Sequence, residues 1–335
     1  NSPPKRSSLP ANARVPHQLG HKGAARPMDP IASVPLPRYI EALRLVRPDA
    51  NRAALERFLA HITDSGRLES CLIGASVDSR DRYRAAILAM PSPGRTVTFF
   101  YSTAGMKAPI ACALTNWAIE SIPCGVADLA QTLLPVNAQA TLAGVLDASF
   151  IHLADLHHMQ CTVRAPSSEP RLPDDLSLHT ADDDELTELL PHTYEGTLDC
   201  PALRGLRQPA DIVQGHRAGG RIEEDLWLVV NRGERHVGCM LITINTDAVA
   251  DLAYIGLIPD ERGHKLSSTL LSIAIKRLVR RRIRQLRLAV DSGNTPALTI
   301  YRQLGFRRIS TQRAAIRSLR DVQVDPGTNE MSTPN

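Results

Sequence analysis

The chain has 335 residues, of which 43% are hydrophobic and 22% charged, the balance of a globular protein large enough for two domains. Five basic residues precede the first acidic residue, Asp29, and account for the net charge of +4, because the rest of the chain carries 34 basic and 35 acidic residues. We therefore expect no nucleic-acid partner, and no apolar run approaches the roughly 20 residues that a membrane span needs.

The six cysteines stand singly, without a CxxC pair or a histidine at metal-ligand spacing. Such a pattern is typical of reduced thiols in a cytoplasmic protein and predicts neither disulfides nor a metal site. Residues 1–36 are basic and rich in Pro and Ser, and we expect them to be disordered, like the tail at 323–335. A Pro/Ser-rich linker at 166–173 divides the remainder into halves at 37–165 and 174–322.

The first half shows regular patterns in several segments. Its clearest segments are strands at 84–90 and 96–102, a helix at 110–121, a strand at 129–137, a helix at 138–150 and a strand at 151–163. The two strands at its start flank a Pro-Ser-Pro-Gly turn and predict a β-hairpin.

The second half reads β-α-α-β-β-β-α-β-α-β. Its clearest segments are 176–180, 182–190, 226–230, 236–244, 250–258, 266–278, 285–291 and 296–304. Asp182 and Glu185 form a capping box at the start of its first helix. The ending of the first half echoes the ending of the second, with Asn137, Ala140 and Phe150 in the places of Asn294, Ala297 and Phe306. This repetition predicts a tandem duplication whose copies have diverged.

The turn from Leu257 to Ser267 is the most informative segment of the second half. It contains Pro259, Arg262 and Gly263 and lies between a predicted strand and a predicted helix. A glycine-containing turn that opens a helix directs several backbone N–H groups one way, and the helix dipole adds positive potential. The turn therefore suits a pyrophosphate, although an ordinary strand-to-helix turn has a similar composition.

A second motif follows the strand at 285–291. It reads Asn-x-x-Ala from Asn294 and Tyr-x-x-x-Gly-Phe from Tyr301. With Pro-x-x-Arg-Gly before a helix, in this order and separation, it resembles the signature of the GNAT N-acetyltransferase superfamily. The resemblance covers 174–322 well and the first half in outline, an arrangement similar to that of tandem acyltransferases of the mycothiol synthase type. It implies an α+β fold of two tandem GNAT-like domains, each a mixed, mostly antiparallel central sheet flanked by helices.

The resemblance also implies a donor and its site. Acetyl-CoA would lie with its pyrophosphate on the backbone amides of the turn and its pantetheine arm along the strand that ends there. Tyr301 occupies the position whose hydroxyl commonly protonates the leaving thiolate in this superfamily. The implied cofactor-binding residues are Leu257, Ile258, Arg262, Gly263, His264, Lys265, Leu266, Ser267 and Asn294.

Two positions depart from the usual P-loop pattern, [QR]-x-x-G-x-[GA]. The first position is Asp260, and the last is Lys265, whose side chain either crowds the pyrophosphate or offsets its charge. Ser267 also stands where a glycine is frequent. These departures bear on how tightly CoA binds.

Three carboxylates are candidates around the acceptor. Asp251, at the start of the central strand, is a candidate general base, and Glu195 and Asp199 fall where an acceptor pocket is usually built. Each alone is more simply interpreted as a solvated surface acid, and several members of the superfamily relay the proton through water.

The first half lacks these features. Gly144 stands in the place of Tyr301, and no Arg-Gly turn precedes the helix at 110–121, so we expect this half to have lost acyl transfer. We expect residues 168–322 to fold alone and bind CoA, and 37–165 to bind none. A basic run at 276–284 has no interleaved aromatic residues and is interpreted as the cationic end of a helix.

The sequence thus predicts an N-acetyltransferase that moves an acetyl group from acetyl-CoA to a small-molecule or peptide amine by direct attack, without a metal. The alternative is a non-catalytic acyl-CoA-binding module that regulates a partner. Tyr301 favours the enzyme, whereas Lys265 and the undecided base are compatible with the module.

Overall fold

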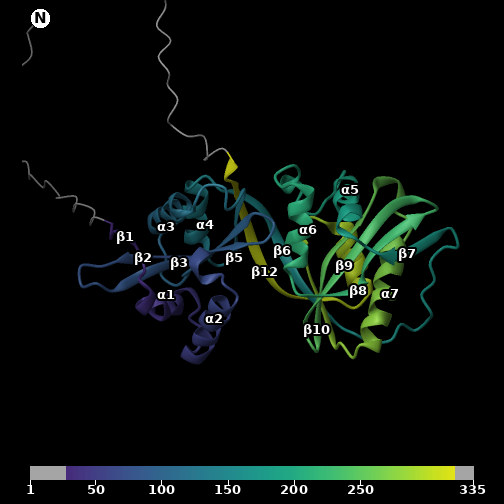
Figure 1. Ribbon diagram of the computed structural model, residues 1–335, viewed down its shortest axis with the longest axis horizontal. Helices are drawn as coiled ribbons and strands as arrows, with labels where there is room; N and C mark the ends of the chain where they lie inside the picture. Colours follow the sequence, from purple (N-terminus) through teal and green to yellow (C-terminus); the bar gives the residue numbers. More distant parts are fainter. Residues whose placement is uncertain (1–27, 321–335) are drawn as a thin grey trace, which may run out of the picture.

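The computed structural model describes residues 28–320 (Figure 1). The strands of the N-terminal half are β1 (Ile31–Ser33), β2 (Leu72–Val77), β3 (Tyr83–Ser92), β4 (Thr96–Tyr101), β5 (Leu129–Pro135) and β6 (Ile151–Thr162). Its helices are α1 (Tyr39–Val46), α2 (Arg52–Asp64), α3 (Ala108–Ser121) and α4 (Gln139–Asp147).

The C-terminal half has the predicted order of elements. Its strands are β7 (Leu176–Thr180), β8 (Arg221–Arg232), β9 (Arg235–Thr246), β10 (Val249–Leu257), β11 (Gln285–Asp291) and β12 (Arg307–Ser318). Its helices are α5 (Asp183–Thr193), α6 (Pro209–Arg217), α7 (Leu266–Arg280) and α8 (Thr295–Gln303). The predicted capping box is present, because the Asp182 carboxylate accepts from the Glu185 amide at 2.8 Å and the Glu185 carboxylate accepts from the Asp182 amide at 3.1 Å.

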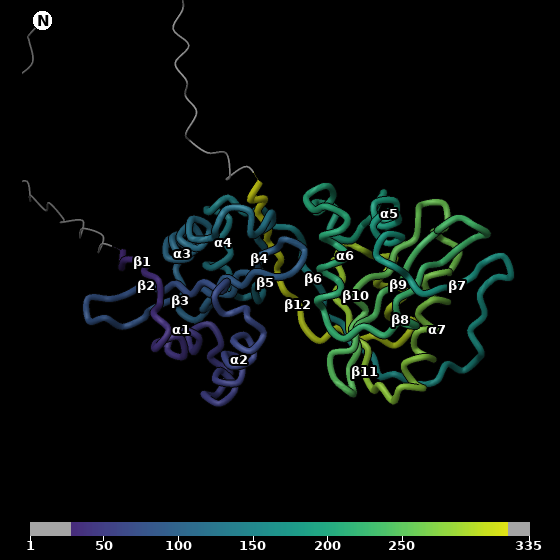
Figure 2. The backbone as a smooth tube through the Cα atoms, in the orientation of Figure 1, coloured from purple at the N-terminus to yellow at the C-terminus, as the bar shows by residue number. Residues whose placement is uncertain are grey.

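All strands form one 12-stranded sheet, in the order β1-β2-β3-β4-β5-β12-β6-β11-β10-β9-β8-β7. Among the described strands, only β4–β5 and β10–β11 pair in parallel. The two halves exchange their last strands: β12 lies between β5 and β6, and β6 pairs with β11 and β12. Figures 1 and 2 show β12, in yellow, running from the C-terminal half into the N-terminal half.

This exchange revises the expected division at 166–173. Met159 and Cys161 of β6 are buried in the C-terminal core, whereas Ala315 and Leu319, at the end of the chain, are buried in the N-terminal core. A fragment of residues 168–322 lacks β6 and leaves one edge of β11 unpaired. The linker therefore does not separate two self-contained units.

The sheet of the C-terminal half is covered on both faces. In β9, every residue from Val237 to Ile244 is buried, which a strand with one solvated face does not show. No helix within residues 28–320 combines the length and apolar character needed to cross a lipid bilayer.

The expected N-terminal disorder is wrong for residues 28–36. There β1 pairs with β2 in antiparallel register and Val34 is 3% exposed, because these apolar residues add an edge strand to the sheet. Residues 1–27 and the tail expected at 323–335 lie outside the described part.

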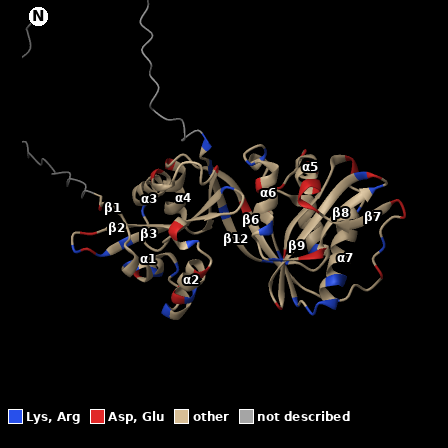
Figure 3. Cartoon of the chain, in the orientation of Figure 1, with Lys and Arg blue, Asp and Glu red and all other residues tan. Residues whose placement is uncertain are grey.

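Basic and acidic residues are interspersed along both halves (Figure 3). At the end of α7, Lys276 pairs with Glu169, and Arg281 with Asp225. The basic run is thus partly neutralised by neighbouring carboxylates.

Candidate active site

A cleft opens where β10 and β11 separate. The two strands pair only from Val249 to Asp251, although β10 stays paired with β9 as far as Leu257. Beyond Asp251, the edge of β10 that faces β11 therefore has no neighbouring strand. The cleft encloses about 280 Å³ and is lined by Thr193, Gly196, Thr197, Leu198, Asp199, Leu252–Leu257, Arg262, Gly263, Ser267, Leu271, Leu288–Val290, Asn294, Pro296, Ala297, Ile300 and Tyr301.

One end of the cleft meets the start of α7. Here β10 gives way to a 3-10 turn (Pro259–Glu261), and α7 begins at Leu266. The N–H groups in the first turn of an α-helix have no intrahelical acceptor, and the helix dipole makes this end electropositive. Gly263 has φ 83°, and a Cβ there would meet no atom within 4 Å, so the space above the turn is open. These features suit an anionic group such as a pyrophosphate.

Lys265 adopts the left-handed conformation, with φ 61°, immediately before α7. Only glycine takes this conformation without steric cost, which gives a physical reason for the small residue usual at this position. The Lys265 side chain is exposed and does not line the cleft. It therefore strains the backbone without filling the space where a ligand would lie.

Two arginines hold the turn in place. The Arg262 guanidinium donates to the Leu257 carbonyl and to the Thr193 carbonyl, both at 3.0 Å, and so ties the end of α5 to the end of β10. Arg232 of β8 donates two hydrogen bonds of 2.8 Å to the Glu261 carboxylate, and this pairing lowers the pKa of Glu261. The sequence assigned only the backbone of Arg262 to the site, whereas the structure shows that its side chain also shapes the cleft.

Tyr301 and Asn294 form the wall contributed by α8. The Asn294 side chain accepts from the Ala297 amide at 3.2 Å and so caps the helix. Tyr301 is 7% exposed, and its ring packs against Phe306 with 5.6 Å between centroids. Burial, and to a smaller extent the charge of Asp199, raises the pKa of Tyr301, so the hydroxyl keeps its proton at neutral pH. The hydroxyl on the cleft wall is therefore a hydrogen-bond donor, and its raised pKa makes it a weaker acid than an exposed tyrosine.

Asp199 also lines the cleft and is linked to the end of β11. Its carboxylate accepts from the Asp291 amide at 2.8 Å, while the Asp291 carboxylate accepts from the Cys200 amide at 3.2 Å. The residue as a whole is exposed, but its carboxyl group is packed against the protein, and this burial raises the pKa of Asp199. A carboxylate with a raised pKa is the better proton acceptor.

Several predicted residues lie outside the cleft. The Glu195 side chain is exposed and turns to His192, with 3.4 Å between Oε1 and Nδ1. Asp251 is contacted by the Asn245 amide and does not line the cleft, because it occupies the last paired position before the strands separate. Burial raises the pKa of Asp251. Ile258 and Leu266 are buried in the core, and His264, like Lys265, is exposed.

The cleft also contains residues that the sequence did not indicate. The Tyr254 hydroxyl and the Thr193 hydroxyl are 2.8 Å apart and join β10 to the end of α5. Tyr254 lines the cleft and directly follows a bulge that shifts the register of β10 against β9 between Leu252 and Tyr254. No local sequence signal marks this bulge.

In the N-terminal half, the corresponding space is closed. A Cβ on Gly144 of α4 would lie 2.1 Å from the Ala108 carbonyl oxygen and 2.7 Å from the Ala111 Cβ, so α4 packs directly on the start of α3. In the C-terminal half, the equivalent helix presents Tyr301 to the cleft instead. Because residue 144 has no side chain, α4 contacts α3 directly at the position where the cleft opens in the C-terminal half.

Comparisons with known proteins agree with this architecture. Residues 190–306 match the Acetyltransferase (GNAT) family. A mycothiol acetyltransferase from Catenulispora acidiphila is 39% identical over 62 residues, which are 18% of this chain and 20% of that protein. One from Saccharomonospora viridis is 25% identical over 157 residues, 43% of this chain and 49% of that protein. The chain thus spans between a fifth and a half of these curated relatives.

Two solved structures resemble the fold over both halves. A GCN5-related N-acetyltransferase from Sphaerobacter thermophilus has a TM-score of 0.57 at 16% identity, covering 86% of this chain and 96% of that one. A tandem GNAT protein from the clavulanic acid biosynthesis pathway has a TM-score of 0.52 at 14% identity, covering 87% and 99%. Both halves of the chain thus share the fold of tandem GNAT proteins, and residues 190–306 of the second half match the acetyltransferase (GNAT) family.

Proposed function

We propose that the C-terminal domain transfers an acetyl group from acetyl-CoA to a primary amine. The observation that carries this proposal is the continuity of the cleft. It joins the open, electropositive start of α7 to a buried, protonated tyrosine, Tyr301, through the unpaired edge of β10. A long donor with a phosphate-rich end and a thioester end requires these features in this order.

The donor would lie along the edge of β10. Its pyrophosphate would accept hydrogen bonds from the amides between Arg262 and Ser267, and its pantetheine amides would pair with the backbone of β10 up to Leu257. Gly263 lets the pyrophosphate approach the backbone closely, because no atom lies within 4 Å of the position that a Cβ would take there. Lys265, exposed beside the turn, is available to a phosphate on the solvent side.

The reaction then needs two proton transfers. The amine nitrogen attacks the thioester carbonyl carbon, forming the C–N bond and placing the electron pair of the carbonyl on oxygen. The C–S bond breaks as that pair returns, and Tyr301 donates its proton to the departing sulfur. Asp199, directly or through water, accepts the proton that the nitrogen loses. Solvent then reprotonates Tyr301 and deprotonates Asp199.

We assign the acceptor to the loop that carries Asp199. Gly196, Thr197 and Leu198 line the cleft beside it and give a short wall with one carboxylate, suited to a small amine that attacks as the neutral base. The similarity to proteins called mycothiol acetyltransferases supports a small-molecule acceptor over a peptide.

Two measurements test the proposal. Calorimetry with acetyl-CoA should show binding, and release of free thiol from acetyl-CoA should accelerate when an amine is supplied from a panel of primary amines. Binding without amine-dependent thiol release for any amine in the panel would favour a non-catalytic acyl-CoA-binding module. Absence of binding would contradict both functions.

A further inference from the structure

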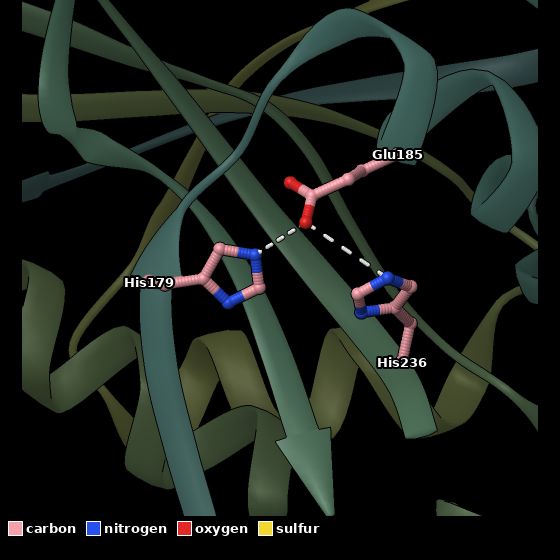
Figure 4. A group of neighbouring side chains, drawn as sticks. All are labelled: His179, Glu185 and His236. Atoms are coloured by element: carbon pink, nitrogen blue, oxygen red, sulfur yellow. Dashed lines mark hydrogen bonds and ion pairs between the residues drawn. The ribbon is translucent and has the colours of Figure 1, made fainter. Parts of the chain in front are cut away.

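A cluster of three metal-ligating side chains lies outside the cleft. His179 of β7, Glu185 of α5 and His236 of β9 point toward one another (Figure 4). His179 Nε2 is 2.8 Å from Glu185 Oε1, and His236 Nε2 is 3.9 Å from the same oxygen. The three side chains are 36%, 25% and 33% exposed, so the cluster is accessible to solvent. None of them lines the cleft.

Neighbouring groups orient two of the three ligands. The Asn231 side-chain oxygen accepts from His236 Nδ1 at 2.8 Å, which leaves the Nε2 lone pair of His236 directed at the cluster. The second oxygen of Glu185 accepts from the Asp182 amide, so the capping box holds the carboxylate in place. Metal-binding histidines usually have such a partner on the other ring nitrogen.

We propose that His179, Glu185 and His236 bind a divalent transition metal of the zinc class, with water as the fourth ligand. Two imidazoles and one carboxylate, with one position open to solvent, form a ligand set that zinc commonly occupies. Bonds of about 2.0–2.2 Å in tetrahedral geometry place ligand atoms about 3.4 Å apart. The two separations from Glu185 Oε1, 2.8 and 3.9 Å, bracket that value, and all three ligand atoms lie within 4.8 Å of one another.

The same groups also form a chain of hydrogen bonds without a metal, from Glu185 through His179 and Asn231 to His236. His179 donates from Nε2 to Glu185, and the Asn231 amide nitrogen lies 3.2 Å from His179 Nδ1. Zinc requires the Nε2 lone pair of His179, so the proton there must leave or move to Nδ1. At Nδ1 it would face the amide nitrogen of Asn231, which is a donor. Asn231 therefore limits the affinity of the site.

The first experiment measures zinc binding by calorimetry. It uses the full chain without a histidine tag, treated with chelator and carrying Cys124→Ser, which removes an exposed thiol. We expect one Zn²⁺ per chain and no saturable binding of Mg²⁺, which prefers oxygen ligands. Glu185→Gln, which can still cap the helix, and His236→Ala should abolish the zinc isotherm.

The matched control is a second histidine–carboxylate pair, formed by His192 near the end of α5 and Glu195 just beyond that helix. His192→Ala removes the partner of Glu195, and it should leave zinc binding unchanged. Equal binding by the parent protein and by His236→Ala, or no saturable binding by the parent, would overturn the proposal. Circular dichroism in zinc-free buffer verifies that each variant is folded.

Asn231→Asp gives a test that does not depend on losing a ligand. A carboxylate at this position accepts from the Nδ1 protons of both histidines, so zinc affinity should rise about tenfold or more. A polar network with only a structural role gives no reason for tighter binding. If the ligand variants fail to fold, unchanged or weaker affinity of Asn231→Asp overturns the proposal.

Discussion

Tyr301→Phe removes only the hydroxyl proposed to protonate the leaving thiolate. The ring is 7% exposed and packs against Phe306, so the fold should survive the change. Because burial raises the pKa of Tyr301, the hydroxyl is a proton donor throughout the neutral range. Loss of a general acid typically lowers the rate by about 10²–10⁴-fold, equivalent to about 3–5 kcal/mol of barrier. Donation develops in the transition state, so acetyl-CoA affinity should change by a factor of a few at most.

The assay combines amine-dependent thiol release, for kcat, with calorimetry, for acetyl-CoA affinity. Tyr101→Phe is the matched control, because Tyr101 is 4% exposed and its hydroxyl lies 2.8 Å from the Thr115 hydroxyl in the other half. It should lower the free energy of unfolding by about 1 kcal/mol and leave kcat unchanged. A folded Tyr301→Phe variant whose kcat stays within a factor of a few would refute the role of Tyr301.

Further predictions concern the turn before α7, Gly144, Asp199 and the shared sheet. Lys265→Gly should keep or raise acetyl-CoA affinity in calorimetry, because φ is 61° there and glycine adopts that conformation without strain. A loss of about 1–3 kcal/mol of binding free energy would instead show an ammonium–phosphate contact. Gly263→Val, at φ 83°, should weaken acetyl-CoA binding about tenfold or more, and unchanged affinity would contradict the assignment of this turn to the pyrophosphate. Gly144→Ala should lower the free energy of unfolding by about 1–3 kcal/mol in urea titrations, since its Cβ would lie 2.1 Å from a carbonyl oxygen. Burial raises the pKa of Asp199, so the folded state binds the proton of this carboxyl more tightly than the unfolded chain does. The free energy of unfolding should therefore fall as pH rises from the ordinary Asp pKa through the raised one. Asp199→Asn should remove that loss and reduce kcat by about 10²–10⁴-fold, and an unchanged kcat would exclude Asp199 as the base. A fragment of residues 168–322 should aggregate in size-exclusion chromatography, whereas a monomeric, CoA-binding fragment would show that β6 is dispensable.

Sequence patterns could predict most helices and strands because their signals are local. The capping box at Asp182, the apolar stripe from Leu266 to Leu278 and the alternation in 285–291 each depend on residues close in the chain. The exchange of β6 and β12 leaves no such signal. The alternation in 151–163 is the same whichever strand lies beside it, so the sequence indicated a strand without its partners.

The candidate site was predictable to a similar extent. Gly263, Asn294 and Tyr301 belong to motifs of fixed spacing, and the structure brings all three to the cleft. Asp251 and Glu195 were predicted as site residues only from their position in the chain. In the structure, their side chains contact Asn245 and His192 and do not line the cleft. The proposed metal site was not predicted from the sequence, because His179, Glu185 and His236 come from three separate elements and have no motif spacing.

The shared sheet also determines the order in which the chain can complete its structure during synthesis. Strand β5 leaves the ribosome early, but its neighbour β12 is among the last described residues to be made. Until then, the N-terminal half has an open strand edge, the feature by which nascent chains associate wrongly. Tandem domains ordinarily fold one after the other, whereas here neither half can close its sheet before the other has formed. We therefore expect the two halves to gain and lose their structure together.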